Sequence, residues 1–344
     1  MAHFEFGLLY SFRNPPRWKA PWPQVYDEHI RHIVEMEQAG FDTIWLTEHH
    51  FSEDGYLPQM ATMTAALAMV TSRVTLAQAI IELPLHHPVA LAEQLAIADI
   101  LSHGRVRVGV GLGRMNYDWR DSFRHEGMVF GASLEPKVRA RMFQEQIEIL
   151  RKCWADGTFQ HTGEFYDFPP IEVTPKPAQA GGPEIWFGVG DQARKAIDRA
   201  ARMGQGWTGF PGGLDNYLNK VREVGRMAEA GKAVVFMPQL PADDPEAMNA
   251  RYGEHLAYIP NWYNPGGTLD VPGWEEPDAP PVTGWFAEPA VIARQLDALR
   301  ARGATGALWF APFAGRSALE ASPIMADIIT KVKPLMRRLA GEGA

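Results

Sequence analysis

Short apolar runs alternate with longer amphipathic segments along most of the chain. The short runs are rich in β-branched and aromatic residues, as buried strands are, and the longer segments repeat their apolar positions every three or four residues, as helices do. The expected strands are Phe4–Tyr10, Thr43–Glu48, Val74–Ile81, Val106–Gly111, Glu184–Val189, Gly206–Phe210, Ala233–Met237 and Ala307–Phe310. The expected helices are Val25–Gln38, Pro58–Val70, Val89–Leu101, Leu134–Trp154, Ala193–Met203, Leu214–Ala230, Pro289–Arg302 and Ile324–Leu339. About eight strand–helix repeats predict an α/β fold, a single (β/α)8 TIM barrel.

Three stretches interrupt this alternation, at about residues 112–133, 158–177 and 238–283. We interpret residues 1–344 as one barrel domain with these insertions at its C-terminal face. The glycines, prolines and aromatic residues of 158–177 predict a hairpin. Residues 238–283 contain Trp262, Tyr263, Trp274 and a Gly266–Gly267 pair. This composition predicts a lid over the barrel mouth, the alternative being a segment pinned permanently to the barrel's flank.

Composition places the chain among globular proteins and narrows its partners. Of its 344 residues 46% are hydrophobic and 22% charged, and the net charge is −8 without a basic run, so neither nucleic acid nor an anionic membrane is expected as a partner. No apolar run approaches the ~18 residues of a membrane span. Its N-terminus lacks the pattern of a secretory signal, and a single cysteine, Cys153, leaves no disulfide framework. We therefore expect a cytoplasmic location.

The richest chemistry follows the second expected strand, at Glu48, His49 and His50. Active sites of (β/α)8 barrels lie at the C-terminal ends of the strands. Successive side chains of a strand point to opposite faces, so the two histidines should differ in orientation, with one facing the barrel mouth. Adjacent histidines lack the i, i+4 spacing of a helical metal site, so no metal is expected. Acid/base chemistry is favoured because imidazole titrates near neutral pH, and a structural role in the loop stays open.

Other strand ends offer room for a ligand. Small residues near Ala79 and Ile80 would let a flat ring approach the backbone, although a plain buried strand has the same pattern. A glycine-rich end at 109–113 lacks the acidic residue and helix of a dinucleotide-binding fold. It leaves room for a ligand, whose polar groups Arg114 and the candidate cofactor-binding residue Asn116 could reach. The turn Gly190, Asp191, Gln192 and Ala193 opens a helix, so it predicts either a phosphate site or an ordinary N-cap at Asp191.

The order of these motifs resembles that of the luciferase-like monooxygenase family. The resemblance is carried by Gly40–Phe51, Leu83-Pro84, His87–Val89, Ala92–Gln94, Asp99–Ser102, Gly104–Gly111, Pro175–Pro177, Pro183–Trp186 and Ala200–Gly204, and returns faintly at Glu288-Pro289. It implies a (β/α)8 barrel that binds reduced flavin, usually FMN, and uses O2. It also implies that His49 transfers protons, that Ala79–Ile80 is a non-prolyl cis peptide against the flavin ring, and that Gly190–Ala193 binds the phosphate.

Two departures from the family pattern limit what the resemblance implies. Leu112 stands where many relatives have an arginine, so the phosphate charge would be met by other groups. Gly111 stands where luciferase has a reactive cysteine, so light emission is not expected.

The resulting hypothesis is a two-component monooxygenase. Reduced FMN from a partner flavin reductase and O2 would oxygenate a small, largely apolar substrate, with Glu48, His49 and His50 as catalytic residues. Phe6, Tyr10 and Phe51 would keep water out, and Phe6 would contact the cofactor. The alternatives are an F420-dependent dehydrogenase or reductase and a non-catalytic flavin-binding protein. Alanine-rich faces on the expected helices 58–70 and 89–101 predict a homodimer.

Overall fold

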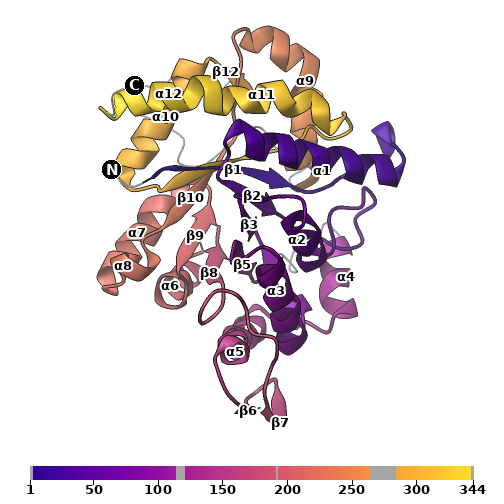
Figure 1. Ribbon diagram of the computed structural model, residues 1–344, viewed down its shortest axis with the longest axis vertical. Helices are drawn as coiled ribbons and strands as arrows, with labels where there is room; N and C mark the ends of the chain where they lie inside the picture. The colour runs from indigo at the N-terminus through magenta and orange to yellow at the C-terminus, as the bar shows by residue number, and fades with distance from the viewer. Residues whose placement is uncertain (1–2, 114–120, 191–192, 264–283, 342–344) are drawn as a thin grey trace. The chain divides into compact units, whose positions relative to one another are not determined.

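The computed structural model describes residues 3–113, 121–190, 193–263 and 284–341, with the side chains of 121–124 and 260–263 left aside. Its strands are β1 (Glu5–Tyr10), β2 (Thr43–Leu46), β3 (Thr75–Gln78), β4 (Ile81–Glu82), β5 (Val106–Gly111), β6 (Phe159–Thr162), β7 (Asp167–Ile171), β8 (Glu184–Gly188), β9 (Gly206–Gly209), β10 (Ala233–Met237), β11 (Leu240–Pro241), β12 (Phe286–Ala287) and β13 (Gly306–Phe310). Its α-helices are α1 (Trp22–Ala39), α2 (Met60–Ala68), α3 (Pro88–Leu101), α4 (Asp121–Val129), α5 (Pro136–Trp154), α6 (Arg194–Met203), α7 (Leu214–Glu223), α8 (Met227–Ala230), α9 (Pro245–Tyr263), α10 (Pro289–Arg302), α11 (Ser322–Asp327) and α12 (Lys333–Leu339). Figure 1 shows the succession of strands and helices along the chain.

Hydrogen bonding joins the main strands in the order β3-β2-β1-β13-β10-β9-β8-β5-β4, and β3 also pairs with β5. The pairs β1–β13, β13–β10, β10–β9 and β9–β8 are all parallel. Both β3 and β4 pair with β5, so they form one strand interrupted at Ala79 and Ile80. The sheet is therefore a closed parallel barrel of eight strands, which confirms the predicted (β/α)8 fold.

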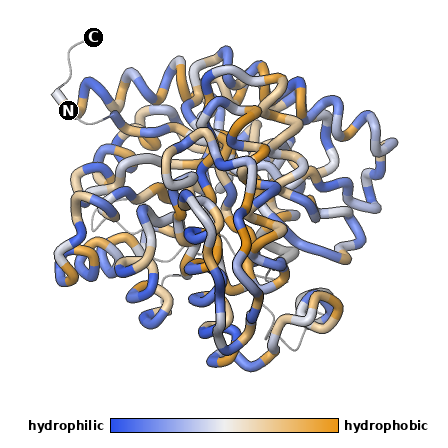
Figure 2. The backbone as a smooth tube through the Cα atoms, turned by 60° about the horizontal axis from the view of Figure 1, so that its bottom comes forward, coloured by the Kyte–Doolittle hydropathy of each residue, from blue (hydrophilic) through white to orange (hydrophobic). Residues whose placement is uncertain are grey.

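The chain divides into two compact units, Leu46–Ile185 and Met1–Trp45 with Trp186–Ala344. In the first unit α2 packs against α3, and α3 against α5. In the second, α6 packs against α7, α10 against α12 and α1 against α11. In Figure 2 the hydrophobic colour is concentrated along strands, while the helices alternate between hydrophobic and hydrophilic turns. The interpretation of residues 1–344 as one domain stays a prediction.

Tryptophans packed against glycines fill the strand layer of the second unit. Trp186 is paired in register with Gly206, and a Cβ on that glycine would overlap the indole ring. Gly7 likewise leaves room for Trp45, whose Nε1 would lie 2.8 Å from a Cβ there. The two indoles meet edge to face with centroids 5.9 Å apart. Large residues opposite small ones thus fill this part of the barrel, as a barrel of this size requires.

Two expected helices are interrupted near residues that do not continue a regular α-helix. The segment Leu214–Ala230 divides into α7 and α8 because Gly225 adopts a positive φ of 72°, a conformation that ends helices. The segment Ile324–Leu339 begins earlier, at Ser322, and contains a π-helical turn at Ile328–Val332. That turn directly precedes Pro334, which has no N–H to donate to the preceding turn.

The insertions contain more regular structure than their composition indicates. Residues 158–177 hold the predicted hairpin, since β6 and β7 pair antiparallel from Phe159–Ile171 to Thr162–Asp167. The stretch 112–133 contains helix α4, and 238–283 contains helix α9 and the strand β11. Residues 264–283, which carry Trp274 and the Gly266–Gly267 pair, lie outside the described residues. The lid stays a prediction.

Position 109 must be a glycine because the backbone of Gln78 lies very close to it. A Cβ at this position would overlap the carbonyl oxygen of Gln78 on the neighbouring strand segment, so the glycine provides room for backbone and not for a ligand. We expect Gly109→Ala to lower the free energy of unfolding by about 2 kcal/mol, because the backbone itself must shift.

Urea unfolding followed by circular dichroism measures this effect. Gly253→Ala is the matched control, because it lies inside α9 and its Cβ would meet only one atom at 3.9 Å. The control should be neutral or stabilising, since alanine favours helix more than glycine. Equal stability of Gly109→Ala and the parent protein would refute the packing argument.

Candidate active site

The end of β2 carries the predicted catalytic residues into the protein interior. All four residues of β2 are buried, and Glu48, His49 and His50 just beyond it are 2%, 5% and 5% exposed. The segment is held by its backbone and neighbours: the His49 N–H donates to the Leu57 carbonyl at 3.3 Å. The Thr47 and Tyr56 hydroxyls lie 3.0 Å apart in hydrogen-bonding contact. Burial of three titratable side chains in succession marks this strand end as a site for chemistry.

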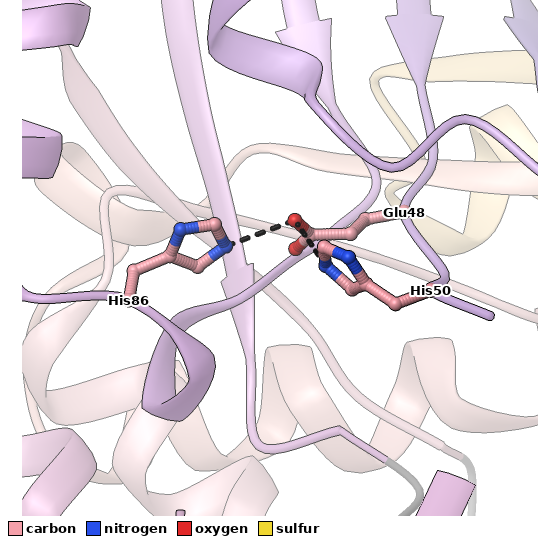
Figure 3. Close-up of side chains that lie close together, drawn as sticks. All are labelled: Glu48, His50 and His86. Carbon is pink, nitrogen blue, oxygen red and sulfur yellow. Dashed lines mark hydrogen bonds and ion pairs between the residues drawn. The ribbon is translucent and has the colours of Figure 1, made fainter. Parts of the chain in front are cut away.

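Glu48 is the centre of a cluster with two histidines, shown in Figure 3. Its Oε1 lies 2.9 Å from Nε2 of His86 and 3.2 Å from Nε2 of His50. Its Oε2 accepts the backbone N–H of Glu82 at 2.7 Å. Three donors thus converge on one buried carboxylate. We call Glu48, His50 and His86 the Glu48 cluster.

Within the Glu48 cluster, the carboxylate of Glu48 and the imidazole of His86 shift each other's pKa values toward the charged forms. Burial alone would raise the pKa of Glu48, but the charge of His86 and the hydrogen bonds from both histidines lower it to about 2. Burial would lower the pKa of His86, but the Glu48 carboxylate outweighs that effect and raises it. Both shifts therefore favour the charged forms of Glu48 and His86, as expected for an ion pair at 2.9 Å.

His49 belongs to a second cluster, with Glu82 and Glu126. Its Nδ1 lies 3.4 Å from Oε1 of Glu82 and 3.7 Å from Oε1 of Glu126. The ring of Tyr56 meets the imidazole edge to face, with centroids 4.7 Å apart. Glu126 also accepts the backbone N–H of His50 at 2.6 Å, which ties α4 to the end of β2. We call His49, Glu82 and Glu126 the His49 cluster.

The two histidines point into different clusters, as strand alternation predicts. Sequence reasoning missed the acidic partners of His49 and did not identify His86 as a partner of Glu48. Glu82 ends β4, so the rule that barrel sites gather at strand ends could have found it. No sequence signal identifies Glu126, because it lies in an insertion.

Each cluster brings three potential metal ligands within 4.8 Å of one another. In the Glu48 cluster the carboxylate already accepts three N–H groups, so hydrogen bonding accounts for its geometry without an ion. In the His49 cluster a protonated imidazole between two carboxylates accounts for the arrangement equally well.

Among the predicted cofactor residues, Ala79 and Ile80 lie in the same unit as both clusters. The peptide bond between them is cis. Ala79 is 9% exposed and its N–H donates to the Leu46 carbonyl at 2.6 Å, at the end of β2. Contact of these residues with a cofactor stays a prediction.

In the other unit, Gly190 and Ala193 flank the start of α6. A Cβ on Gly190 would meet nothing within 4 Å, and α6 begins at Arg194 without a side-chain cap. Within the described ranges the first backbone N–H groups of α6 have no side-chain acceptor, an arrangement that can bind an anion. Asn116, Asp191 and Gln192 lie outside the described residues.

Phe6, Tyr10 and Phe51, the aromatic residues expected to exclude water, differ in what they contact and in how far they are buried. Phe6 stacks on Trp309, and the Lys333 ammonium of α12 lies 5.0 Å from its ring, so Phe6 packs against the helix layer. The Tyr10 hydroxyl bonds Nδ1 of His32 on α1 at 2.8 Å. Phe51 is 55% exposed. These contacts describe how Phe6 and Tyr10 pack and show that Phe51 is exposed. The predicted exclusion of water by these residues and the predicted contact of Phe6 with the cofactor stay predictions.

Comparison with known proteins identifies the family. The family model described as luciferase-like monooxygenase matches residues 4–315. The chain therefore belongs to the luciferase-like monooxygenase family.

One of the curated relatives is the oxygenase component of a monooxygenase. The chain is 32% identical to the oxygenase component of flavin-dependent trigonelline monooxygenase from Acinetobacter baylyi, over 49% of this chain and 44% of that protein. It spans about half the length of the curated relatives it matches.

Solved structures that share the fold include a monooxygenase and a dehydrogenase. The oxygenating constituent of 3,6-diketocamphane monooxygenase from Pseudomonas putida, in complex with FMN, has a TM-score of 0.76 at 20% identity, covering 97% of this chain and 99% of that one. An F420-dependent secondary alcohol dehydrogenase has a TM-score of 0.71 at 16% identity, covering the same shares.

Proposed function

We propose that the protein is the oxygenase of a two-component flavin-dependent monooxygenase. A separate flavin reductase would deliver reduced FMN, one atom of O2 would enter a small organic substrate, the other would leave as water, and FMN would be oxidised. The observation that carries the proposal is the burial of His49 between two carboxylates at the end of β2, in a chain of this family. Such a group can hold and transfer a proton in a site that excludes water.

The residues present fit a flavin phosphate at the start of α6. Open space at Gly190, uncapped N–H groups and the exposed Arg194 and Lys195 together suit an anion. These groups would replace the arginine that Leu112 does not provide. When bound, reduced FMN would supply the electrons that activate O2. His49 would move the proton at its ring, and the Glu48 cluster would hold the strand end rigid.

Binding distinguishes this proposal from its main alternative. We expect FMN and reduced FMN to bind with micromolar or lower dissociation constants. Fluorescence titration and anaerobic absorbance titration measure these constants. Binding of F420 without FMN would instead assign the chain to hydride transfer, as in the dehydrogenase of the same fold. Tight FMN binding without any O2-dependent turnover would indicate a flavin-binding protein.

The location of the protein is proposed as cytoplasmic. None of the helices within the described ranges combines the length and apolarity needed to cross a bilayer.

We propose that the protein forms a homodimer through α2 and α3. The contact surface would differ in part from the alanine-rich faces that the sequence indicates. The alanines Ala61, Ala68, Ala92, Ala96 and Ala98 are buried within the unit, where they let α2 and α3 pack closely. The large apolar residues left exposed there are Met69, Val70, Ile97, Ile100 and Leu101, and Ala66 and Ala90 are exposed as well. Exposed apolar groups on neighbouring helices favour a protein interface.

Charge on this surface should break the dimer. We expect Ile97→Asp, at a side chain 48% exposed, to raise the dimer dissociation constant at least tenfold, because a carboxylate would be desolvated in the interface. Analytical ultracentrifugation measures the change. Met227→Asp is the control, since Met227 is similarly exposed at 41% on α8 of the other unit. A parent protein that is monomeric at micromolar concentration would refute the proposal.

A further inference from the structure

Glu126 is a buried carboxylate that a nearby positive charge would stabilise. The residue is fully buried on α4, in the segment that the sequence pattern left without structure. Its Oε1 accepts the His50 N–H and lies 3.7 Å from Nδ1 of His49. Within the described part of the chain its Oε2 has no hydrogen-bond partner. A backbone N–H alone compensates a buried carboxylate poorly.

The neighbouring charges pair with other groups. Three carboxylates, Glu48, Glu82 and Glu126, lie close together in this unit. Glu48 is paired with His86. Arg139 of α5 interacts electrostatically with Glu82. Among the side chains that the structure describes, His49 is the basic group that lies beside Glu126, at 3.7 Å.

We propose that Glu126 is a positioning residue that keeps a proton on Nδ1 of His49 and so fixes which ring nitrogen serves the reaction. This inference rests on the proposed role of His49 in proton transfer. With Nδ1 directed toward Glu126 and Glu82, Nε2 is directed to the opposite side of the ring and exchanges the proton. A carboxylate that orients a catalytic imidazole through its other nitrogen is a general device of enzymes.

The groups that face His49 come from three directions. Glu82 at the end of β4 and Glu126 of α4 both favour the protonated ring. Tyr56 contributes its ring to the contact. Arg139 and His86 add positive charge beyond the carboxylates and oppose protonation more weakly, because each acts through its own acidic partner. Removing the charge of Glu126 while keeping its shape therefore isolates its contribution.

The test is a ¹⁵N and ¹³C NMR titration of the histidines in the flavin-free protein, with His49→Asn used for assignment. In Glu126→Gln the amide oxygen can still accept the His50 N–H, so the fold should persist. We expect the midpoint of His49 to fall by about one pH unit or more relative to the parent, the size of effect of a carboxylate at this distance. Glu145→Gln is the matched control: Glu145 pairs with His161 at 3.0 Å, so the midpoint of His49 should not change.

The parent protein alone provides a second measurement, which does not depend on the variant folding. Its Nδ1 should show the ¹⁵N shift of a protonated nitrogen at pH 7. An unprotonated Nδ1, or an unchanged His49 midpoint in Glu126→Gln, would overturn the proposal. So would saturable binding of Zn²⁺ alone that both Glu126→Gln and His49→Asn abolish, since the same atoms would then hold a cation. None of these readouts needs turnover, so a failure of the monooxygenase proposal would be seen separately, as absence of FMN-dependent activity.

Discussion

His49→Ala should lower the rate of product formation by roughly 10²-fold or more while FMN still binds, because an alanine cannot hold or transfer the proton that the imidazole does. The loss should appear mainly in kcat, since no predicted phosphate-binding group is altered. A reductase-coupled assay with a substrate panel, together with flavin titration of the same preparation, measures both quantities.

The control for this variant is His103→Asn. His103 is an exposed histidine at the end of α3 with a positive φ of 56°, a conformation that asparagine tolerates well. This control should retain full activity. Undiminished turnover in His49→Ala would remove His49 from the mechanism.

The largest expected effect on stability is that of Glu48→Gln. An amide cannot present acceptors to His50, His86 and the Glu82 N–H at once, and the charge of His86 loses its counter-ion. Breaking a buried ion pair from one side costs about 3–5 kcal/mol. We expect about 3 kcal/mol for glutamine, which retains some of the hydrogen bonds. Glu53→Gln, at an exposed glutamate nearby, should change stability by less than about 0.5 kcal/mol.

The effect of Glu48→Gln should depend on pH with a defined sign. The pKa of His86 is raised, so its contribution is complete below the unfolded value of 6.5 and is lost as the pH rises through the native value. The pKa of Glu48 is lowered to about 2, so its contribution is complete above the unfolded value of 4.5 and is lost as the pH falls toward 2. The difference between parent and variant should thus be greatest between pH 4.5 and 6.5. Urea unfolding at pH 5.5 and pH 8.5 tests it, and a larger difference at the alkaline pH would contradict the ion pair.

Much of the fold follows from local pattern. The strands Val106–Gly111 and Ala233–Met237 begin and end where the sequence predicts, because apolar alternation stops at residues that suit turns. Helices α4 and α9 could not be predicted in the same way. The sequence of α4 has no clear apolar stripe, and α9 contains Gly253 and Pro260, residues that usually indicate a loop.

The candidate site could be predicted only in part. Glu48, His49 and His50 follow a strand, so the barrel rule located them. Their partners lie far along the chain: the Glu82 N–H bonds Glu48 across 34 positions, and Glu126 reaches His50 across 76. Such contacts depend on tertiary packing, which periodicity does not encode.

The reaction of the reduced complex with oxygen tests the central claim most directly. The protein is saturated anaerobically with reduced FMN, mixed with O2 in a stopped-flow instrument, and followed by flavin absorbance with and without candidate substrates. The proposed function predicts that bound flavin is reoxidised with kinetics distinct from free FMN, and that ¹⁸O from labelled O2 enters the product. Reoxidation identical to that of free flavin, with no label in any product, would contradict it.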